Sequence, residues 1–498
     1  MLVDKTPLAG ANELKQTAVR GVFWTGSGTV GRQLVQVTTS LILARLLTPD
    51  VFGLLGMAMV FIEIAQLFVD FGLGLAVLQT RQASEILLSS CFWLSSGAAV
   101  VAALLVFGAA PAIAEVYGEP RITMLMPFLS LNLVLAGVSA IPSSLLQREM
   151  RFAALAKITF ASAIVSSAIA VALAATGFGV WSLVIQPLVG TSMMCICLFA
   201  ASKWLPRWEF SWASLRGVIR FSSGILGTTL LNYSMRNSDN FLVGRFIGAD
   251  ALGYYTMAYR LMLFPLGQVS NAIGKVAFPI LVQLQNDGDR YRKFYLRSCS
   301  AVAFVTFPMM CGLFVVADTF VAVVLGDKWL PATTVLKILC PVGLLQSIGT
   351  SVGNIFNSTG RTRTQFWWSL AAAPVTIAAF AVGLFWGIEG VASCYAAVST
   401  VLTLFSFRIA FKIVGLTLQS LAGALWRPLA CGLLMAIGLF ALDRIVLAAN
   451  FTGLLRLGAD VSSGAAMYLS LSIMINRQEL KILFEQARAI LRPATATF

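Results

Sequence analysis

The chain has 498 residues, of which 58% are hydrophobic and only 11% charged, and its mean hydropathy is +0.85. A soluble globular protein carries about 25% charged residues, so this composition excludes the soluble class and indicates a membrane protein. The net charge is +14 and there is no His, which argues against His-based zinc sites and catalytic triads.

Fourteen apolar segments of about 20 residues follow one another along the chain, each long enough to span the hydrocarbon core of a bilayer. They are expected near 20–43, 51–74, 88–110, 122–146, 155–176, 179–201, 218–246, 252–280, 298–325, 332–357, 367–387, 389–411, 426–447 and 456–475. The polar start, Met1–Gln16, has no A-x-A cleavage pattern, so the first segment is expected to remain. The predicted fold is an all-α polytopic membrane protein with about 14 transmembrane helices.

Lys and Arg are concentrated in alternate connections. Both ends of the chain and the connections after even-numbered segments hold 24 of the 35 basic residues, whereas the opposite connections hold six. Because cytoplasmic loops retain Lys and Arg, both termini are predicted in the cytoplasm. The basic charge suits anionic headgroups of the phospholipid bilayer and does not imply nucleic acid as a partner.

An internal repeat organises the segments. The stretch Ala44–Gly53 is echoed by Gly244–Gly253, with Arg, Asp and Gly at a common offset of 200 residues. Six segments separate the copies, which predicts two six-helix lobes as a parallel repeat, plus a C-terminal helix pair. The expected parts are a cytoplasmic N-terminal segment 1–19, an N-lobe 20–202, a cytoplasmic linker 203–217, a C-lobe 218–415, a helix pair 416–475 and a basic cytoplasmic tail 476–498.

Four basic residues, Arg32, Arg236, Arg260 and Lys275, lie deep in segments 1, 7 and 8. A charge at the bilayer centre costs at least ~2.5 kcal/mol, so these side chains are expected to face a watery cavity or a partner. Polar neighbours fall on the same helical faces of segments 1, 2, 7 and 8: Thr25, Gly28, Gln36 and Ser40; Glu63, Gln66 and Asp70; Asn232, Asp239 and Asn240; Gln268 and Asn271. This gathering predicts a pore or cleft between two lobes.

Two interpretations of these residues stay open. In the functional one, Arg32, Arg236, Arg260 and Lys275 recognise an anionic headgroup such as pyrophosphate, which Arg binds bidentately. Gln36, Asn232 and Asn271 then belong to the same substrate site, and Glu63, Asp70 and Asp239 bind a coupling ion or proton. In the structural one, the acids simply pair with Arg32 or Arg236, since Arg236 and Asp239 are spaced i, i+3.

The eight Cys lie inside apolar segments and are expected to be small buried residues rather than metal ligands. There is no P-loop, nucleophile elbow, metal cluster or large soluble domain. The sequence therefore predicts that the protein is not an enzyme and uses no cofactor, with energy supplied by an ion gradient.

Several motifs resemble those of bacterial polysaccharide exporters. They are Leu43–Gly53, Phe68–Gly74, Arg236–Gly248, Ala258–Met262 and Trp386–Ala392. The family is that of the lipid-linked oligosaccharide flippases of the colanic-acid and teichuronic-acid type, in the multidrug/oligosaccharidyl-lipid/polysaccharide superfamily. The resemblance runs from about residue 17 to 415.

The resemblance implies transfer of undecaprenyl-pyrophosphate-linked repeat units across the bacterial inner membrane, for exopolysaccharide or lipopolysaccharide biosynthesis. It further implies alternating access driven by a sodium or proton gradient, with a polysaccharide polymerase and a chain-length regulator as partners. By location, Arg32 is the position expected to engage the pyrophosphate.

Two alternative functions remain. A membrane polysaccharide polymerase usually needs a sizeable periplasmic loop, and no loop on that side exceeds roughly 15 residues. A multidrug or metabolite exporter of the same superfamily, if its cargo is a small cation, would favour acids and aromatics over four buried basic residues.

Overall fold

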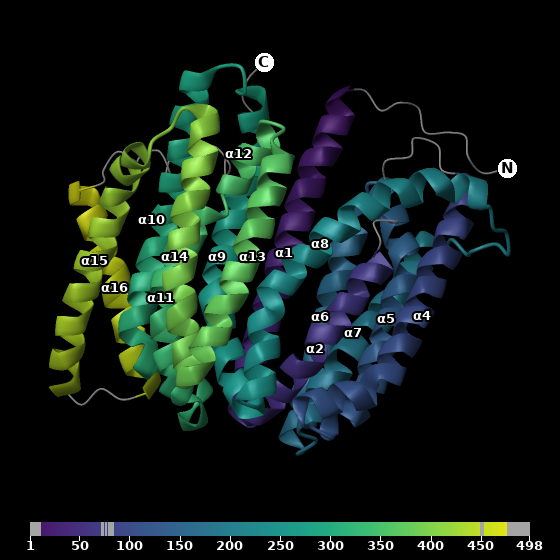
Figure 1. Cartoon of the computed structure of the whole chain (residues 1–498), viewed down its shortest axis with the longest axis horizontal. Helices are drawn as coiled ribbons and strands as arrows, with labels where there is room; N and C mark the ends of the chain where they lie inside the picture. The colour runs from purple at the N-terminus through teal and green to yellow at the C-terminus, as the bar shows by residue number, and fades with distance from the viewer. Residues whose placement is uncertain (1–10, 71–73, 75–76, 78–83, 449–452, 476–498) are drawn as a thin grey trace. The chain divides into compact units, whose positions relative to one another are not determined.

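The computed structural model describes residues 11–70, 74, 77, 84–448 and 453–475, with the backbone alone for 11–27, 70, 213–214, 217–228, 231–232 and 445–448. Every regular element in this part of the chain is a helix (Figure 1). The longer helices are α1 (Ala11–Leu46), α2 (Pro49–Asp70), α4 (Glu85–Tyr117), α5 (Arg121–Arg148), α6 (Phe152–Ala175), α7 (Val180–Ser202), α8 (Trp212–Phe246), α9 (Ala249–Gln283), α10 (Gly288–Phe320), α11 (Pro331–Gly349), α12 (Val352–Ser358), α13 (Thr362–Gly383), α14 (Gly387–Val414), α15 (Leu418–Ala448) and α16 (Gly453–Ile475).

Each of the fourteen predicted segments coincides with one of these helices or with two in succession. The segment expected near 332–357 is interrupted, because α11 ends at Gly349 and α12 begins at Val352. The hydroxyl groups of Thr350 and Ser351 donate to the carbonyls of Ser347 and Ile348, at 3.0 and 2.6 Å. The backbone N–H of Ser351 also donates to Ile348, at 3.0 Å, so the four-residue spacing of α-helical hydrogen bonds is interrupted here.

The segment expected near 298–325 also differs from a single regular helix. After α10 ends at Phe320, a π-helical turn continues over Val321–Leu325. Helix α8 begins at Trp212, inside the predicted linker 203–217, so the non-helical part of that linker is 203–211. Leu215 is buried in a cluster with Leu88 and Cys91, and this burial favours the earlier start of the helix.

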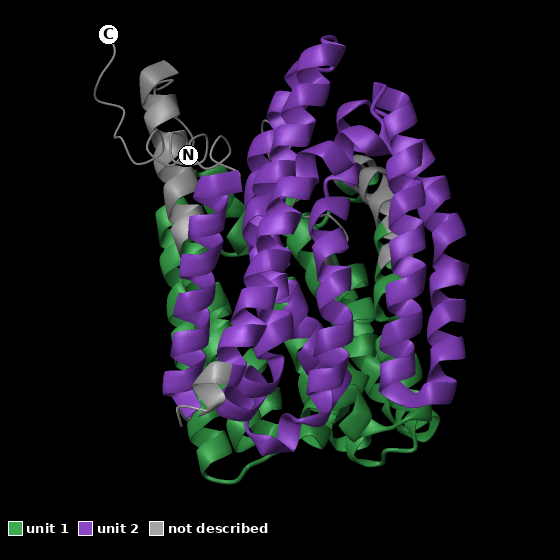
Figure 2. Cartoon of the chain, turned by 90° about the vertical axis from the view of Figure 1, so that its left-hand side faces the viewer, with its two compact units in different colours: residues 1–253 green, residues 254–498 purple. Residues whose placement is uncertain are grey.

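The chain divides into two compact units, residues 1–253 and 254–498 (Figure 2). In the first unit, α4 packs on α5, and α1 and α7 pack on α6. In the second, α10 packs on α11 and α15, and α14 on α11 and α13. Small residues bring the helices close, as where the Ser95 hydroxyl donates to the carbonyl of Gly137 at 3.1 Å.

The two copies of the repeated motif begin helices α2 and α9 and pack against each other within the first unit. A Cβ added to Gly53 would lie 2.6 Å from the carbonyl carbon of Ala249. A Cβ added to Gly253 would lie 2.7 Å from the carbonyl carbon of Pro49. Only glycine permits backbones to approach this closely, which accounts for the Gly at the end of each copy.

The segment 203–211 is fastened to the start of α4. The hydroxyls of Ser89 and Ser90 accept hydrogen bonds from the backbone N–H groups of Arg207 and Ser211, at 3.0 and 2.9 Å. The Trp93 indole donates to the Arg207 carbonyl at 2.8 Å and stacks on the exposed ring of Trp208 at 4.3 Å. These contacts give the connection a fixed course over the helix end.

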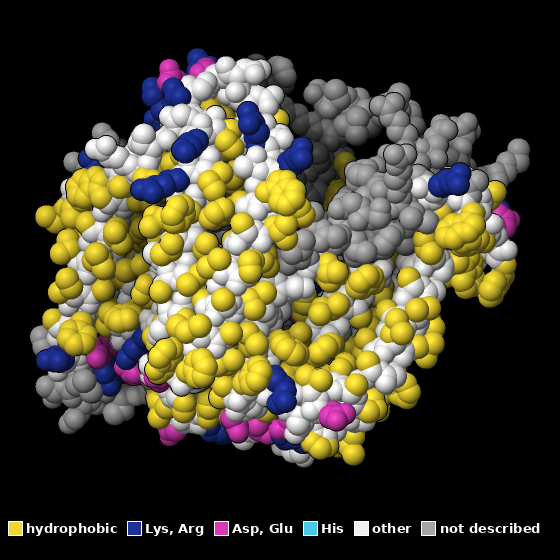
Figure 3. Space-filling view, viewed as in Figure 1, with side chains coloured by type: hydrophobic (Ala, Val, Ile, Leu, Met, Phe, Trp, Pro, Cys, Tyr) yellow, Lys and Arg dark blue, Asp and Glu magenta, His cyan; other side chains and the backbone are white. Residues whose placement is uncertain are grey.

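Nine helical segments among the described residues are long and apolar enough to cross a membrane. On the face shown in Figure 3, hydrophobic side chains cover the middle of the helices in each unit, and charged side chains gather toward their ends. This distribution fits a bilayer, with an apolar band and polar borders, and the protein is a multi-pass membrane protein. Helix α9 is described along its whole length and is not among the nine.

Candidate functional site

Helix α1 carries Arg32 and Gln36, and both side chains are exposed. The helix packs on α6 through Gly28 and Gly31, where an added Cβ would meet Ala156 at 2.7 Å and Phe160 at 2.9 Å. Part of the predicted polar stripe, Gly28, therefore contacts a neighbouring helix. Arg32 lies one turn after Gly28, and its side chain is exposed.

Helices α2 and α8 meet around Tyr233. Its hydroxyl donates to the carbonyl of Val60 at 3.1 Å and lies against the Glu63 carboxyl group. The rings of Phe61, Tyr117 and Phe241 pack edge to face beside it, with centroids 5.7–6.3 Å apart. The arrangement places a carboxyl group and a phenol together where α2 and α8 meet.

Asp239 is 3% exposed and lies within electrostatic range of the Tyr233 hydroxyl, as does Glu63. Its carboxylate accepts a hydrogen bond from the backbone N–H of Asn240 at 2.8 Å. Arg236, one turn earlier on α8, is exposed, so this acid and base occupy different environments. The structure thus gathers two of the three predicted coupling acids in one cluster.

Two predicted site residues fall outside this description. The side chains of Asp70, at the end of α2, and Asn232, on α8, lie outside the described residues. Their assignment to the coupling-ion and substrate sites stays a prediction.

In the second unit, Arg260, Asn271 and Lys275 are exposed along α9. The buried side of the helix is also polar in places, because the Ser270 hydroxyl donates to the carbonyl of Ser347 at 3.0 Å. These polar residues agree with the absence of α9 from the helices that are apolar enough to cross a membrane. A helix of this composition is suited to a polar environment on one face.

Tyr259, beside Arg260, belongs to an aromatic group in the same unit. Its hydroxyl lies 3.3 Å from that of Tyr395, and its ring stacks on Tyr255 at 6.0 Å. The Gln346 amide donates to the Tyr395 hydroxyl. Polar atoms of α9, α11 and α14 thus meet in one network that the stripe pattern of the sequence does not reveal.

A further acid escaped the sequence prediction because it stands alone in an apolar segment. Asp460 on α16 is 1% exposed, and neither carboxyl oxygen has a hydrogen-bond partner among the described residues. Nearby, Arg456 on the same helix donates two hydrogen bonds to Asp443 of α15, at 3.0 and 2.6 Å. A lone acid among small and apolar residues gives no periodic signal.

Within the described part of the chain, no group of three or more Cys, Asp or Glu residues could hold a metal ion. All eight Cys are free, five of them buried.

Comparison with known proteins identifies the family. The family model described as "Polysaccharide biosynthesis protein" matches residues 42–334, more than half of the chain. The chain belongs to this family. This confirms the resemblance indicated by the sequence motifs.

Named relatives extend over most of the chain. The lipopolysaccharide biosynthesis protein WzxC of Escherichia coli (strain K12) is 28% identical over 426 residues, which cover 83% of this chain and 85% of WzxC. The succinoglycan biosynthesis transport protein ExoT of Rhizobium meliloti (strain 1021) is 29% identical over 485 residues, covering 95% and 96%. The family is one of transporters rather than enzymes, as predicted.

The fold is that of a solved flippase. The structure of the lipid II flippase MurJ in an inward closed conformation superposes with a TM-score of 0.75 at 16% identity, covering 92% of this chain and 99% of MurJ. At this identity the likeness concerns the fold alone, and it supports an all-helical polytopic membrane architecture.

Proposed function

We propose that this protein is a flippase for undecaprenyl-pyrophosphate-linked oligosaccharide repeat units. It moves them from the cytoplasmic to the periplasmic leaflet of the bacterial inner membrane, for exopolysaccharide or lipopolysaccharide biosynthesis. The observation that carries the proposal is the polysaccharide biosynthesis family match over residues 42–334. The similarity to ExoT, a succinoglycan biosynthesis transport protein, and the MurJ-like fold support it.

The pyrophosphate of the substrate is bound by Arg32, Arg236, Arg260 and Lys275, with Gln36, Asn232 and Asn271 as hydrogen-bond partners. Support comes from the exposure of the four basic side chains along helices α1, α8 and α9. An exposed cation inside a membrane helix needs water or an anion, and a pyrophosphate supplies several acceptor oxygens. Arg32 makes the first contact in this proposal.

Transport proceeds by alternating access coupled to a sodium or proton gradient, with Glu63, Asp70 and Asp239 binding the ion. Support comes from the cluster around Tyr233, where Glu63 and Asp239 lie close to one phenol. Because the chain has no His, protons would have to be carried by carboxyl groups.

A leaflet-exchange assay tests the function. The full-length protein is reconstituted into vesicles containing a fluorescent undecaprenyl-pyrophosphate oligosaccharide, and a membrane-impermeant reductant destroys the fluorophore in the outer leaflet. The expected result is loss of nearly all fluorescence, against about half in protein-free vesicles. A labelled phospholipid is the matched substrate control, and equal exchange of both lipids, or of neither, would contradict the proposal.

The orientation and partners are tested separately. With both termini cytoplasmic, a green fluorescent protein fused to the C-terminus is expected to fluoresce in cells, whereas an alkaline phosphatase fusion is expected to be inactive. The polymerase and chain-length regulator use the flipped product, so loss of this protein should stop polymer formation while lipid-linked repeat units accumulate.

A further inference from the structure

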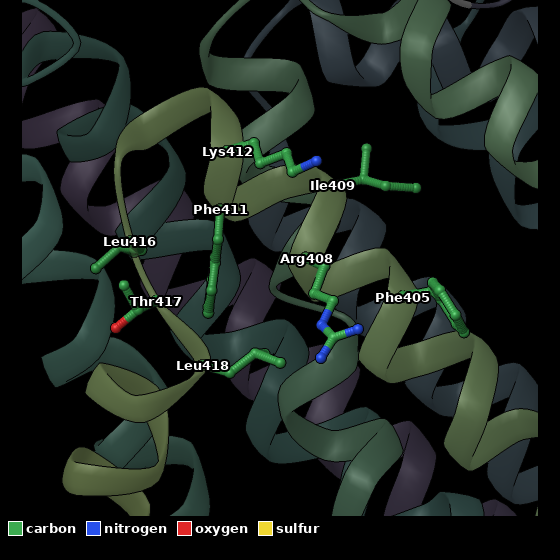
Figure 4. Close-up of a pocket in the computed structure, with 8 residues that line it drawn as sticks. All are labelled: Phe405, Arg408, Ile409, Phe411, Lys412, Leu416, Thr417 and Leu418. Carbon is green, nitrogen blue, oxygen red and sulfur yellow. The ribbon is translucent and has the colours of Figure 1, made fainter.

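A cavity of about 570 Å³ lies in the second unit, where α14 ends and the chain turns into α15 (Figure 4). Its lining comes from the last turns of α14, the connection and the first residue of α15: Phe405, Arg408, Ile409, Phe411, Lys412, Leu416, Thr417 and Leu418. The cavity thus combines two cations, one hydroxyl and an apolar wall.

The two cations occupy successive turns of α14. Arg408 and Lys412 are spaced i, i+4 and are both exposed, and neither forms an ion pair with any side chain that the structure describes. Like charges at this spacing repel each other unless an anion lies near both. The pair therefore offers a binding site to an anion from outside the chain.

Acidic side chains near this end of the unit are already occupied. Arg292 of α10 donates to the Val414 carbonyl at 3.3 Å, which places the start of α10 beside the end of α14. Arg292 also pairs with Asp289 at 2.5 Å, and Arg290 with Asp287 at 3.3 Å. Both acids are thereby engaged with arginines of their own helix.

An apolar stripe continues from the cations along the same face of α14. Phe405, Leu404 and Val401 precede Arg408 by three, four and seven residues, and they are 49%, 45% and 51% exposed. In Figure 4, Phe405 and Arg408 lie on α14, with Leu416 and Leu418 across the cavity. A basic site joined to an exposed apolar stripe matches a molecule with an anionic head and a hydrocarbon tail.

We propose that this cavity binds one anionic phospholipid of the surrounding bilayer. Its phosphate lies between Arg408 and Lys412, and an acyl chain runs along Phe405, Leu404 and Val401. The Thr417 hydroxyl, which accepts from the Ser420 N–H at 3.1 Å, lies at the opposite side of the headgroup. The site is distinct from the proposed transport residues and does not depend on the flippase proposal.

Native mass spectrometry of the detergent-solubilised full chain tests the proposal. The protein is titrated with phosphatidylglycerol, with phosphatidylcholine of the same acyl chains, and with inorganic phosphate. We expect one tightly retained phosphatidylglycerol. The variant Arg408→Gln with Lys412→Gln should bind it roughly 30-fold more weakly, at about 1 kcal/mol for each basic residue near an anionic lipid surface.

Matched variants identify the source of the binding. Arg361→Gln with Arg363→Gln removes two exposed charges outside the cavity lining and should leave retention unchanged. Phe405→Gln should weaken retention of the long-chain lipid and leave the protein's melting temperature in detergent unchanged. Equal retention of phosphatidylcholine, unchanged retention by the Arg408 and Lys412 variant, or displacement of the lipid by inorganic phosphate would each overturn the proposal.

Discussion

Gly53 and Gly253 hold equivalent positions in two crossing helices, each glycine facing the backbone of the other helix's first residue. Gly53 faces Ala249, and Gly253 faces Pro49. The contact is reciprocal, as expected when two copies of one motif pack about a local two-fold axis. The sequence repeat therefore corresponds to a specific packing contact, made by the residues that define the repeat.

Replacing either glycine by Ala should destabilise the protein strongly. The new methyl group would overlap a backbone carbonyl that cannot move aside, and overpacking costs about 1–3 kcal/mol, occasionally more. Thermal unfolding in detergent measures the loss. Gly97→Ala, at an exposed helical position with no atom within 4 Å of the added Cβ, should be neutral or stabilise by about 0.5–1 kcal/mol. Unchanged melting of Gly53→Ala and Gly253→Ala would contradict the contact.

Arg32→Ala combined with Arg236→Ala should abolish polymer export, because both guanidinium groups are proposed to bind pyrophosphate. Losing two charge-assisted contacts of about 1.5 kcal/mol each predicts a decrease of roughly 100-fold. Surface polysaccharide in a complemented deletion strain is the readout, alongside protein level in the membrane. Arg363→Ala is the control, and full export by the double variant would remove the assigned role.

Asp70→Asn and Asp239→Asn should weaken the ion dependence of transport in proteoliposomes. The amide keeps the volume of the side chain and cannot carry a negative charge, so a coupling ion loses its ligand. The rate is measured with and without an imposed sodium or proton gradient. If the dependence is the same as in the unmodified protein, both acids have a structural role only.

Trp93→Phe should loosen the segment 203–211. The change removes the hydrogen bond to the Arg207 carbonyl and weakens the stack on Trp208, at a cost of about 1–2 kcal/mol. Limited trypsin digestion should then cut faster after Lys203 and Arg207. Trp386→Phe, at a site that is 67% exposed, serves as the comparison. Equal cleavage rates in the unmodified protein and in both variants would show that the Trp93 contacts do not protect the segment 203–211 from trypsin.

Asp460→Val should stabilise the protein by about 1–3 kcal/mol, because it removes a buried carboxyl group without a partner among the described residues. Arg456→Leu should do the opposite, since it leaves Asp443 without its ion pair. Melting temperatures in detergent distinguish the two. A folded Asp460→Val protein that no longer transports would instead assign the acid to transport.

Apolar runs and flanking charges were sufficient to predict the helices. The span expected at 122–146 is bounded by Arg121 and Arg148, and these are the ends of α5. The interruption between α11 and α12 could not be predicted in this way, because Thr and Ser also occur inside the continuous helices of this protein. The break there is seen in the backbone hydrogen bonds, since the Ser351 N–H donates to Ile348, three residues back, rather than four.

The candidate site was predictable only in part. Spacing along α8 and α9 identified the polar residues, but not that Asp239 would be buried while Arg236 is exposed. Burial on α8 follows from its packing on α2 and α4, which are distant in sequence. The burial of Asp460 could not be predicted for a similar reason, because α16 packs on α10 and α15.

Helix α9 bears a consequence for biogenesis. Helix α9 contains Lys and Arg, and each of these residues near the centre of a helix raises the free energy of its insertion into lipid by about 2.5–3.5 kcal/mol. Insertion of α9 by itself is therefore unfavourable. We therefore expect α9 to insert into the bilayer together with more apolar helices rather than by itself. Arg260 and Lys275, which are proposed to bind phosphate, would thus also influence the order in which the helices insert into the membrane.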